Sequence, residues 1–434
     1  MKSKTLNFKG LKNFFILWGT QAFSALGSSM TSFALVIWSY QQQGSALTTA
    51  GLSIFSYAPY VLLSIFAGSL ADRWDKRKIL VLCDLFAALS TVALLILLKT
   101  GQLQIWHLYG INILNGLMNT LQQPATELAV TLLTPKEQVQ RVGGLRSLSS
   151  SLVTLLSPAL ATAMLTLLGL EAVIAFDLLT CAAAVGSVIF LIRFPESKPP
   201  EEKKNLLRSA WEGMQWLLKN RGILDMILFL AVINLIVSIF NAALAPMILS
   251  RPGGGETVLG ILQVFTGAAN LVGSLLVTLL PAPKSRVRVI FNSLLFSMST
   301  QNLLLALGHQ AGIWYFSSIL GWLCIPIVNA NLGALLRLYI PVEMQGRVFA
   351  ARNTLQFFTI PVGYLLGGWL VDQVCEPFMA NLPDGAFLTQ LLGSGKGSGA
   401  ALVFLIIAAA GVLVCLGFRK NKNIWRLEKT EPSE

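Results

Sequence analysis

Two acidic side chains lie inside long apolar segments, where a charge is costly and usually has a function. Glu127 is eight residues from the end of its segment and Asp177 six residues into the next but one, roughly 12 Å and 9 Å deep at 1.5 Å per helical residue. Either carboxyl could bind and release a proton. Glu127 could instead be a structural acid satisfied by an arginine such as Arg146, and Asp177 could make a helix-packing hydrogen bond. Asp84 is expected to neutralise basic residues near the inner surface.

Amides and hydroxyls recur every three or four residues in three of the apolar segments. They are Gln21, Ser24 and Ser28 in the first, Asn112, Asn115, Asn119, Gln122 and Thr126 in the fourth, and Asn234, Ser238 and Asn241 in the seventh. This spacing places each set on one face of a helix. The tenth segment carries Asn329 and Asn331. In a bilayer such a face meets either a water-filled cavity or other helices through interhelical hydrogen bonds.

The elements that carry these residues are membrane-spanning helices. Of 434 residues, 54% are hydrophobic and 12% are charged, far below the charged fraction of roughly one quarter in soluble domains. A span needs about 20 apolar residues, and the sequence predicts twelve. They begin near Phe14, Thr48, Ile79, Trp106, Val142, Ala172, Gly222, Thr257, Val289, Ile313, Ala350 and Gly399. An even number places both termini on one side.

The net charge of +12 reflects membrane orientation and not a nucleic-acid partner. All lysines and arginines except Lys99, Arg251 and Lys396 fall on one side of the predicted spans, and that side is the cytoplasm by the positive-inside rule. The five cysteines and two histidines show no metal or redox spacing. We therefore expect no metal site, no cofactor and no enzymatic activity in this multi-pass protein of the cell (inner) membrane.

The sequence divides into two similar halves. We predict an N-terminal half at 1–194, a cytoplasmic linker with an interfacial amphipathic helix at 195–221, a C-terminal half at 222–418 and a cytoplasmic tail at 419–434. The halves repeat at an offset of about 200 residues, as Pro135 with Arg141 and Pro341 with Arg347 illustrate. Two parallel six-span repeats are typical of one class of secondary transporter. The outer segment 372–399 contains several glycines and is expected to be a flexible linker.

The loop after the second span resembles the signature loop of the major facilitator superfamily. It reads Gly68-Ser69-Leu70-Ala71-Asp72-Arg73-Trp74-Asp75-Lys76-Arg77-Lys78. The resemblance implies an all-α fold of twelve spans in two six-helix halves. It also implies that Gly68, Asp72, Arg73 and Arg77 hold a cytoplasmic gate closed, a network that Glu127 could join.

The same resemblance implies that spans one, four, seven and ten line a central cavity. The substrate cavity would then contain Gln21, Asn112, Asn115, Asn119, Gln122, Asn234, Asn241 and Asn329. Such a cavity is uncharged at its centre and edged by aromatic residues such as Phe240 and Trp322, which suits a large amphiphile. Sugars would need denser hydrogen-bonding groups and anionic metabolites a buried arginine, and neither is evident at mid-membrane.

Several further segments look like the macrolide-efflux branch of drug/proton antiporters. They include Ser157-Pro158-Ala159, Arg193-Phe194-Pro195 and Gly346-Arg347-Val348-Phe349. This resemblance implies an exporter of hydrophobic drugs that exchanges them for protons. We therefore expect a monomeric exporter of amphipathic small molecules, with Glu127 and Asp177 as the coupling acids. A siderophore or metabolite exporter of the same architecture is the nearest alternative. A non-transporting membrane receptor or assembly factor is the alternative from another class.

Overall fold

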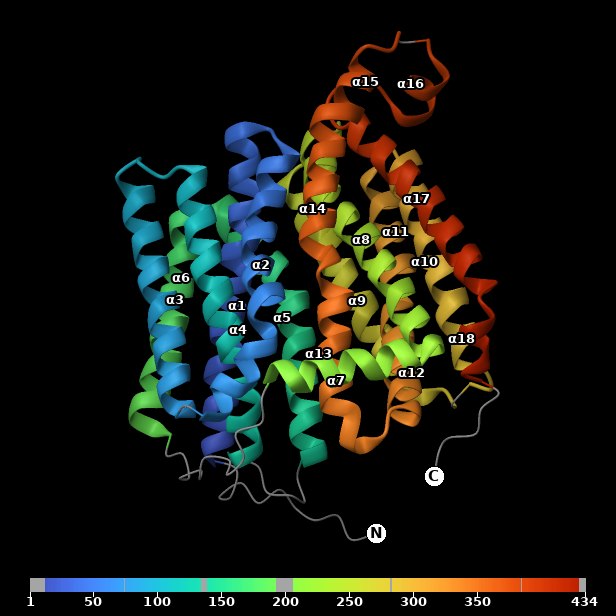
Figure 1. Cartoon of the computed structure of the whole chain (residues 1–434). Coiled ribbons are helices and arrows are strands. Elements are labelled where there is room, and N and C mark those ends of the chain that lie inside the picture. Colours follow the sequence, from blue (N-terminus) through green and yellow to red (C-terminus); the bar gives the residue numbers. More distant parts are fainter. Residues whose placement is uncertain are drawn as a thin grey trace. The chain divides into compact units, whose positions relative to one another are not determined.

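The structure is a computed structural model in which residues 12–73, 75–133, 139–192, 206–281, 283–383 and 385–428 are described. These residues are helical throughout their regular structure, as Figure 1 shows. Contacts divide the chain into two compact units. Unit 1 comprises residues 1–34 and 58–203, and unit 2 comprises residues 35–57 and 204–434. The segment 35–57 therefore packs with unit 2, although it lies in the N-terminal half of the sequence.

Unit 1 contains the helices of the first half. They are α1 (Lys12–Gln43, as far as residue 34), α2 (Ala46–Arg73, from residue 58), α3 (Lys76–Lys99), α4 (Ile105–Leu133), α5 (Val139–Leu168), α6 (Leu170–Gly186) and the π-helical turn η2 (Ser187–Leu191). Helix α3 packs against α4 and α6, and α5 packs against α6. Asp75 begins α3 as its N-cap, because its carboxylate accepts a hydrogen bond from the Arg77 backbone N–H at 2.9 Å.

Unit 2 contains the helices of the second half together with the outer ends of α1 and α2. They are α7 (Leu206–Lys219), α8 (Arg221–Ser250), α9 (Glu256–Leu279), α10 (Arg286–Leu307), α11 (Ala311–Leu323), α12 (Ile325–Tyr339), α13 (Val342–Phe357), α14 (Thr359–Trp369), η3 (Leu370–Cys375), α15 (Glu376–Ala380), α16 (Phe387–Leu392), α17 (Ser398–Arg419) and α18 (Lys422–Arg426). Helix α8 packs against α14 and α17, and α10 packs against α11 and α17.

Eleven helical stretches in the described residues are long and apolar enough to cross a membrane. Helix α4 is the predicted span missing from this set. Its 29 residues suffice for a crossing, but the amides at Asn112, Asn115, Asn119 and Gln122 lower its hydropathy. The sequence features that make α4 a candidate site therefore also weaken its signature as a span.

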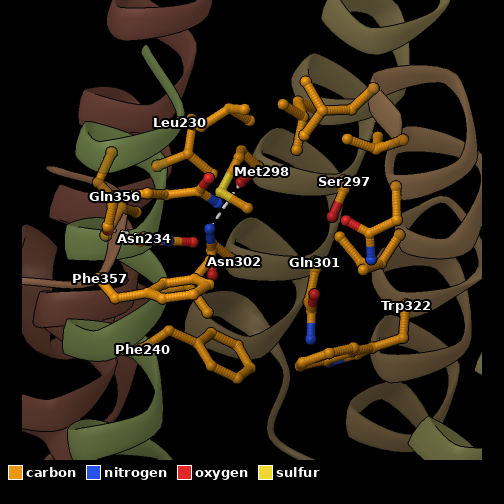
Figure 2. A pocket seen from close by; sticks show the side chains of 18 of the residues that line it. Leu230, Asn234, Phe240, Ser297, Met298, Gln301, Asn302, Trp322, Gln356 and Phe357 are labelled. Carbon is orange, nitrogen blue, oxygen red and sulfur yellow. Dashed lines mark hydrogen bonds between the residues drawn. The ribbon is translucent and has the colours of Figure 1, made fainter. Parts of the chain in front are cut away.

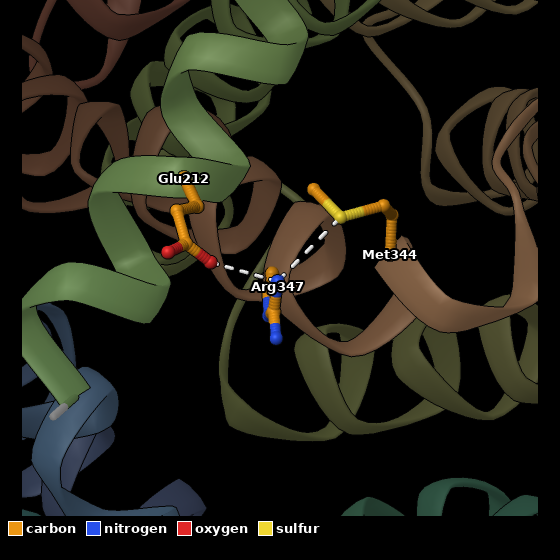
Figure 3. Close-up of polar contacts among 3 residues, drawn as sticks. All are labelled: Glu212, Met344 and Arg347. Atoms are coloured by element: carbon orange, nitrogen blue, oxygen red, sulfur yellow. Dashed lines mark hydrogen bonds and ion pairs between the residues drawn. The ribbon is translucent and has the colours of Figure 1, made fainter. Parts of the chain in front are cut away.

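The amphipathic helix α7 packs on unit 2 along the start of α13. A methyl group added to Gly213 would lie 2.4 Å from the Arg347 carbonyl oxygen, so the two helices are in backbone contact there. Figure 3 shows Glu212 of α7 beside Arg347, whose Nη1 lies 2.7 Å from the carboxylate. Both side chains are one third exposed. The pair attaches a polar side chain of the amphipathic helix to α13.

The C-terminal segment also packs on unit 2 as far as residue 428. Asn421 and Asn423 each donate a side-chain hydrogen bond of 2.9 Å to the Asp225 carboxylate of α8. The Ile424 side chain is fully buried, and the Trp425 ring stacks on Phe291. The described part of the predicted tail is thus part of the folded unit.

Candidate functional site

Asp84 lies at the centre of a polar contact between three helices of unit 1. Its side chain is 4% exposed. One carboxylate oxygen accepts from the Gln21 amide of α1 at 2.8 Å, and the other accepts from the Gln122 amide of α4 at 2.5 Å. The expectation that Asp84 neutralises basic residues at the inner surface is wrong, because its carboxylate is held by these two neutral amides.

Asp177 lies in a second polar contact of the same unit, between α6, α1 and α3. The side chain is 3% exposed, and its two oxygens accept from the Ser28 hydroxyl at 2.9 Å and the Thr91 hydroxyl at 3.5 Å. Gly27 lets α1 approach, because a methyl group there would lie 2.9 Å from the Asp177 Cα atom. The structure thus shows the helix-packing hydrogen bonds that were one of the two interpretations of Asp177.

The two acids lie along one helix interface. Their partners Gln21 and Ser28 are seven residues apart on α1, about 10 Å at helical rise. The Cys181 thiol of α6 donates to the Asp84 carbonyl oxygen at 3.3 Å, so both acids share the α3–α6 contact. We call Gln21, Ser28, Asp84, Gln122 and Asp177 the polar seam.

The amides of α4 differ in their surroundings. Gln122 belongs to the polar seam, whereas Asn112 donates to the Leu108 carbonyl of its own helix at 2.9 Å. The Asn115 carbonyl oxygen is buried and has no hydrogen-bond partner among the described residues, and Asn119 is exposed. The amides that spacing predicts on one face of α4 therefore have different partners and different exposure.

Three of the four predicted gating residues are described by their backbone only. Gly68, Asp72 and Arg73 lie in the last turns of α2, but their surroundings are outside the described part of the structure, as is the Glu127 side chain on α4. Arg77 is described: its guanidinium is exposed and donates to the Ile189 carbonyl oxygen of η2 at 2.5 Å. This contact lies within unit 1, and the gating role of the four residues stays a prediction.

Unit 2 contains a cavity of about 350 Å³, which Figure 2 shows from close by. Its walls come from α8, α10, α11, α12 and α13. The lining residues are Leu230, Ile233, Asn234, Ile236, Val237, Phe240, Leu294, Ser297, Met298, Gln301, Asn302, Trp322, Ile325, Val328, Asn329, Leu332, Arg352, Gln356 and Phe357. Two of the three substrate-cavity amides predicted in this half, Asn234 and Asn329, line it, and Asn241 is absent from the lining.

Two cavity amides carry buried polar atoms without a partner among the described residues. They are the Nε2 atom of Gln301 and the Oδ1 atom of Asn302, on side chains that are 6% and 3% exposed. The Asn302 amide nitrogen donates to the Met298 carbonyl at 2.8 Å, as Figure 2 shows. Gln301 packs against Gly321 of α11, where an added methyl group would lie 1.8 Å from its Oε1 atom.

An arginine in this cavity is a residue that sequence reasoning missed. Arg352 of α13 lines the cavity, and its Nε atom donates to the Oε1 atom of the Gln356 side chain at 2.9 Å. Arg352 was not among the predicted cavity residues, and its side chain is half-buried. Arg352 follows the start of the predicted eleventh span at Ala350, so a charge just inside a span was the available signal.

The outer end of the α1–α2 hairpin is held on unit 2 by one carboxylate. Asp372 of η3 accepts from the Ser45 hydroxyl at 2.6 Å and from the backbone N–H groups of Ala46 and Leu47 at 2.9 and 2.8 Å. It therefore caps the N-terminus of α2, where a negative charge is favourable. Because α1 and α2 continue into unit 1, this contact ties the start of α2 to the second half of the sequence.

The outer segment 372–399 is anchored where the structure describes it, so the expectation of a flexible linker is wrong. Arg251 donates to the carbonyl oxygens of Gly308, at 3.0 Å, and Leu392. Burial lowers the pKa of the Arg251 guanidinium from its ordinary value, and the charge of Glu376 opposes that shift. Glu376 itself accepts from the Gly397 backbone N–H at 2.9 Å near the start of α17.

The sequence model of the Major Facilitator Superfamily matches residues 17–364. This chain belongs to that superfamily. The match covers most of the chain, and together with the eleven membrane-length helices it identifies a multi-pass membrane transporter and not an enzyme. This assignment replaces the alternative of a non-transporting receptor.

The curated relatives of this transporter include proteins named for macrolide efflux. Macrolide efflux protein A of Streptococcus pyogenes is 25% identical over 83% of this chain and 90% of its own length. The protein of the same name from Enterococcus faecalis is 26% identical over 74% of this chain and 99% of its own length. The uncharacterized MFS-type transporter YfiS of Bacillus subtilis is 24% identical over 85% of this chain and 88% of its own length.

Solved transporter structures share the fold. A mutant of the nucleoside transporter NupG has a TM-score of 0.66 and 14% identity, and the match covers 94% of this chain and 99% of that one. An inward-facing, unoccupied bacterial homologue of the human lysosomal transporter Spinster has a TM-score of 0.65 and 12% identity, with 98% of both chains covered. At these identities the likeness concerns the fold alone.

Proposed function

We propose that this transporter exports amphipathic small molecules of the macrolide type from the cell in exchange for protons. The observation that carries this proposal is the similarity, over four fifths of the chain, to relatives named for macrolide efflux. The proposed topology is twelve spans in two six-helix repeats, in which α4 is added to the eleven membrane-length stretches. Both termini would lie in the cytoplasm, and the protein would be a monomer in the cell (inner) membrane.

The proposed cycle is alternating access of the two halves around one substrate site. Gly68, Asp72, Arg73 and Arg77 would stabilise the state that is closed to the cytoplasm. The Asp372 contact with the start of α2 supports a corresponding attachment on the outer side, because it joins the hairpin of the first half to unit 2.

Proton exchange is assigned to Glu127 and Asp177. Asp177 supports this assignment through its burial within the polar seam, where its described partners are hydroxyl groups and not cations. A hydroxyl can accept a hydrogen bond from a protonated carboxyl as well as donate one to a carboxylate. The site can therefore hold either form of the acid without rebuilding its contacts.

Efflux of a labelled macrolide from cells that lack their own pumps tests the proposal. The wild type should lower the accumulated label, and a protonophore should abolish that difference. Glu127→Gln and Asp177→Asn should reduce protonophore-sensitive efflux, whereas Glu212→Gln, which changes an acid outside the proposed path, should not.

Absence of macrolide efflux from well-expressed wild type would overturn the macrolide assignment. Efflux that persists in both acid variants and in the presence of a protonophore would overturn proton coupling. The metabolite-exporter alternative has one specific observation in its favour, which is the arginine in the unit 2 cavity.

A further inference from the structure

We propose that the unit 2 cavity binds the anionic group of an aromatic amphiphile, with Arg352 as the charge partner and Trp322, Phe240 and Phe357 as its apolar wall. This inference rests on the proposed export of amphiphiles and not on the macrolide assignment, and it adds the charge of the cargo. A carboxylate attached to an aromatic ring is the simplest group with this chemistry.

Arg352 provides the first reason. The guanidinium has five N–H donors, and Nε uses one of them on Gln356. None of the lining residues that the structure describes is acidic. A cation beside an apolar cavity within a membrane span is costly unless it is paired, so an anionic ligand would relieve a cost that the folded protein already bears.

Gln301 and Asn302 provide the second reason. Buried polar atoms in proteins nearly always have a partner, and exceptions need an explanation. Both residues line the cavity, their side chains are more than nine-tenths buried, and Nε2 of Gln301 and Oδ1 of Asn302 have no partner among the described residues. A ligand that carries a carboxylate with a neighbouring hydroxyl would satisfy the donor and the acceptor together once the two amide groups turn toward it.

The shape and lining of the cavity provide the third reason. About 350 Å³ is at the lower end of the range for small-molecule sites, which suits one ring system with its charged group. Figure 2 shows Phe240 and Phe357 across from Trp322, so flat apolar surfaces face the space beside the amides. The remainder of a larger cargo would lie outside this cavity.

The charge of Arg352 also predicts that the cavity discriminates between anionic and cationic ligands. An amphiphile with a protonated amine in place of the carboxylate would meet a like charge in an apolar setting, which is unfavourable. The cavity should therefore prefer the anion of two ligands that share one ring system.

Binding to the purified full-length transporter in nanodiscs tests this inference. The probes are tritiated 2-naphthoate and, as competitor, 2-naphthylmethylammonium. Wild type should bind 2-naphthoate, and the amine should compete poorly. Arg352→Gln, which keeps a hydrogen-bonding side chain but removes the charge, should weaken binding by at least about tenfold, the scale of a charge-assisted hydrogen bond. Arg352→Lys should bind more tightly than Arg352→Gln.

The matched control is Arg347→Gln, one turn and a half earlier on the same helix, where the arginine pairs with Glu212 outside the cavity. It should bind 2-naphthoate like the wild type. Equal naphthoate affinity in wild type and Arg352→Gln, when both are monodisperse, would overturn the inference. Equal affinity of wild type for the amine and the carboxylate would overturn it as well.

This experiment uses no gradient and no macrolide, so its failure is separate from failure of the proposed function. If the wild type binds the carboxylate and the amine equally well but still exports macrolides, only the cavity assignment is wrong. Selective naphthoate binding without macrolide efflux would keep the cavity assignment and favour export of an anionic metabolite.

Discussion

Charged side chains have opposite surroundings in the polar seam of unit 1 and in the cavity of unit 2. In the polar seam of unit 1, both oxygens of Asp84 and of Asp177 accept hydrogen bonds from neighbouring helices. In unit 2, Arg352 faces a cavity and shares its wall with two unpaired amide atoms. A satisfied buried charge holds helices together, whereas an unsatisfied charge beside a cavity is available to a ligand. The comparison assigns stability to the Asp84 contacts of the seam and recognition to the cavity.

The largest expected effect is on the stability of unit 1. Asp84→Leu removes the acceptor for two buried amides, and each unpaired group costs about 1–3 kcal/mol, so we expect a loss of about 3 kcal/mol. Arg352→Leu removes a cation that has no acidic partner among the described residues, and it should leave stability unchanged or higher. Thermal unfolding of the detergent-solubilised variants measures both.

Asp84→Asn is the control for this pair, because its carbonyl oxygen retains one acceptor and the loss should be smaller than in Asp84→Leu. An Arg352→Leu variant that loses as much stability as Asp84→Leu would contradict the comparison, since Arg352 would then be a structural partner.

Two glycines sharpen the comparison through their different neighbours. A methyl group at Gly27 would lie 2.4 Å from the Thr180 hydroxyl oxygen, and one at Gly321 would lie 1.8 Å from the Gln301 Oε1 atom. Each alanine variant should lose about 1–3 kcal/mol through overpacking. Gly27→Ala should keep wild-type affinity for 2-naphthoate, whereas Gly321→Ala should weaken it by displacing Gln301. Equal effects of the two variants on affinity would argue against a cavity specific to unit 2.

The smallest expected effect concerns the two arginines of α13. Arg347 pairs with Glu212 at a site where both side chains are one third exposed, and such pairs contribute about 0.2–1 kcal/mol. A double-mutant cycle with Arg347→Gln and Glu212→Gln should give a coupling energy in that range from unfolding midpoints. A coupling near zero would mean that packing, such as that at Gly213, and not this ion pair holds α7 against α13.

Helical periodicity predicted which polar residues share a helix face, and the family resemblance placed those faces on a substrate cavity. Asn234 and Asn329 line the unit 2 cavity. Gln21 and Gln122 donate to Asp84, and their role in a substrate cavity stays a prediction. The spacing of residues fixes which face of a helix they share, but it does not fix which helix that face meets. The roles of Asp72, Arg73 and Glu127 stay predictions.

The sequence by itself determined the helical membrane fold and the superfamily, because apolar length and the loop from Gly68 to Lys78 are local features of the chain. It also determined that α7 is amphipathic, through the spacing of its apolar residues. Only the tertiary structure decided which buried charges are paired. Asp84 finds its partners 63 and 38 residues away, and Arg352 lines a space formed by five helices. Pairing over such distances depends on how helices pack, and no local pattern encodes it.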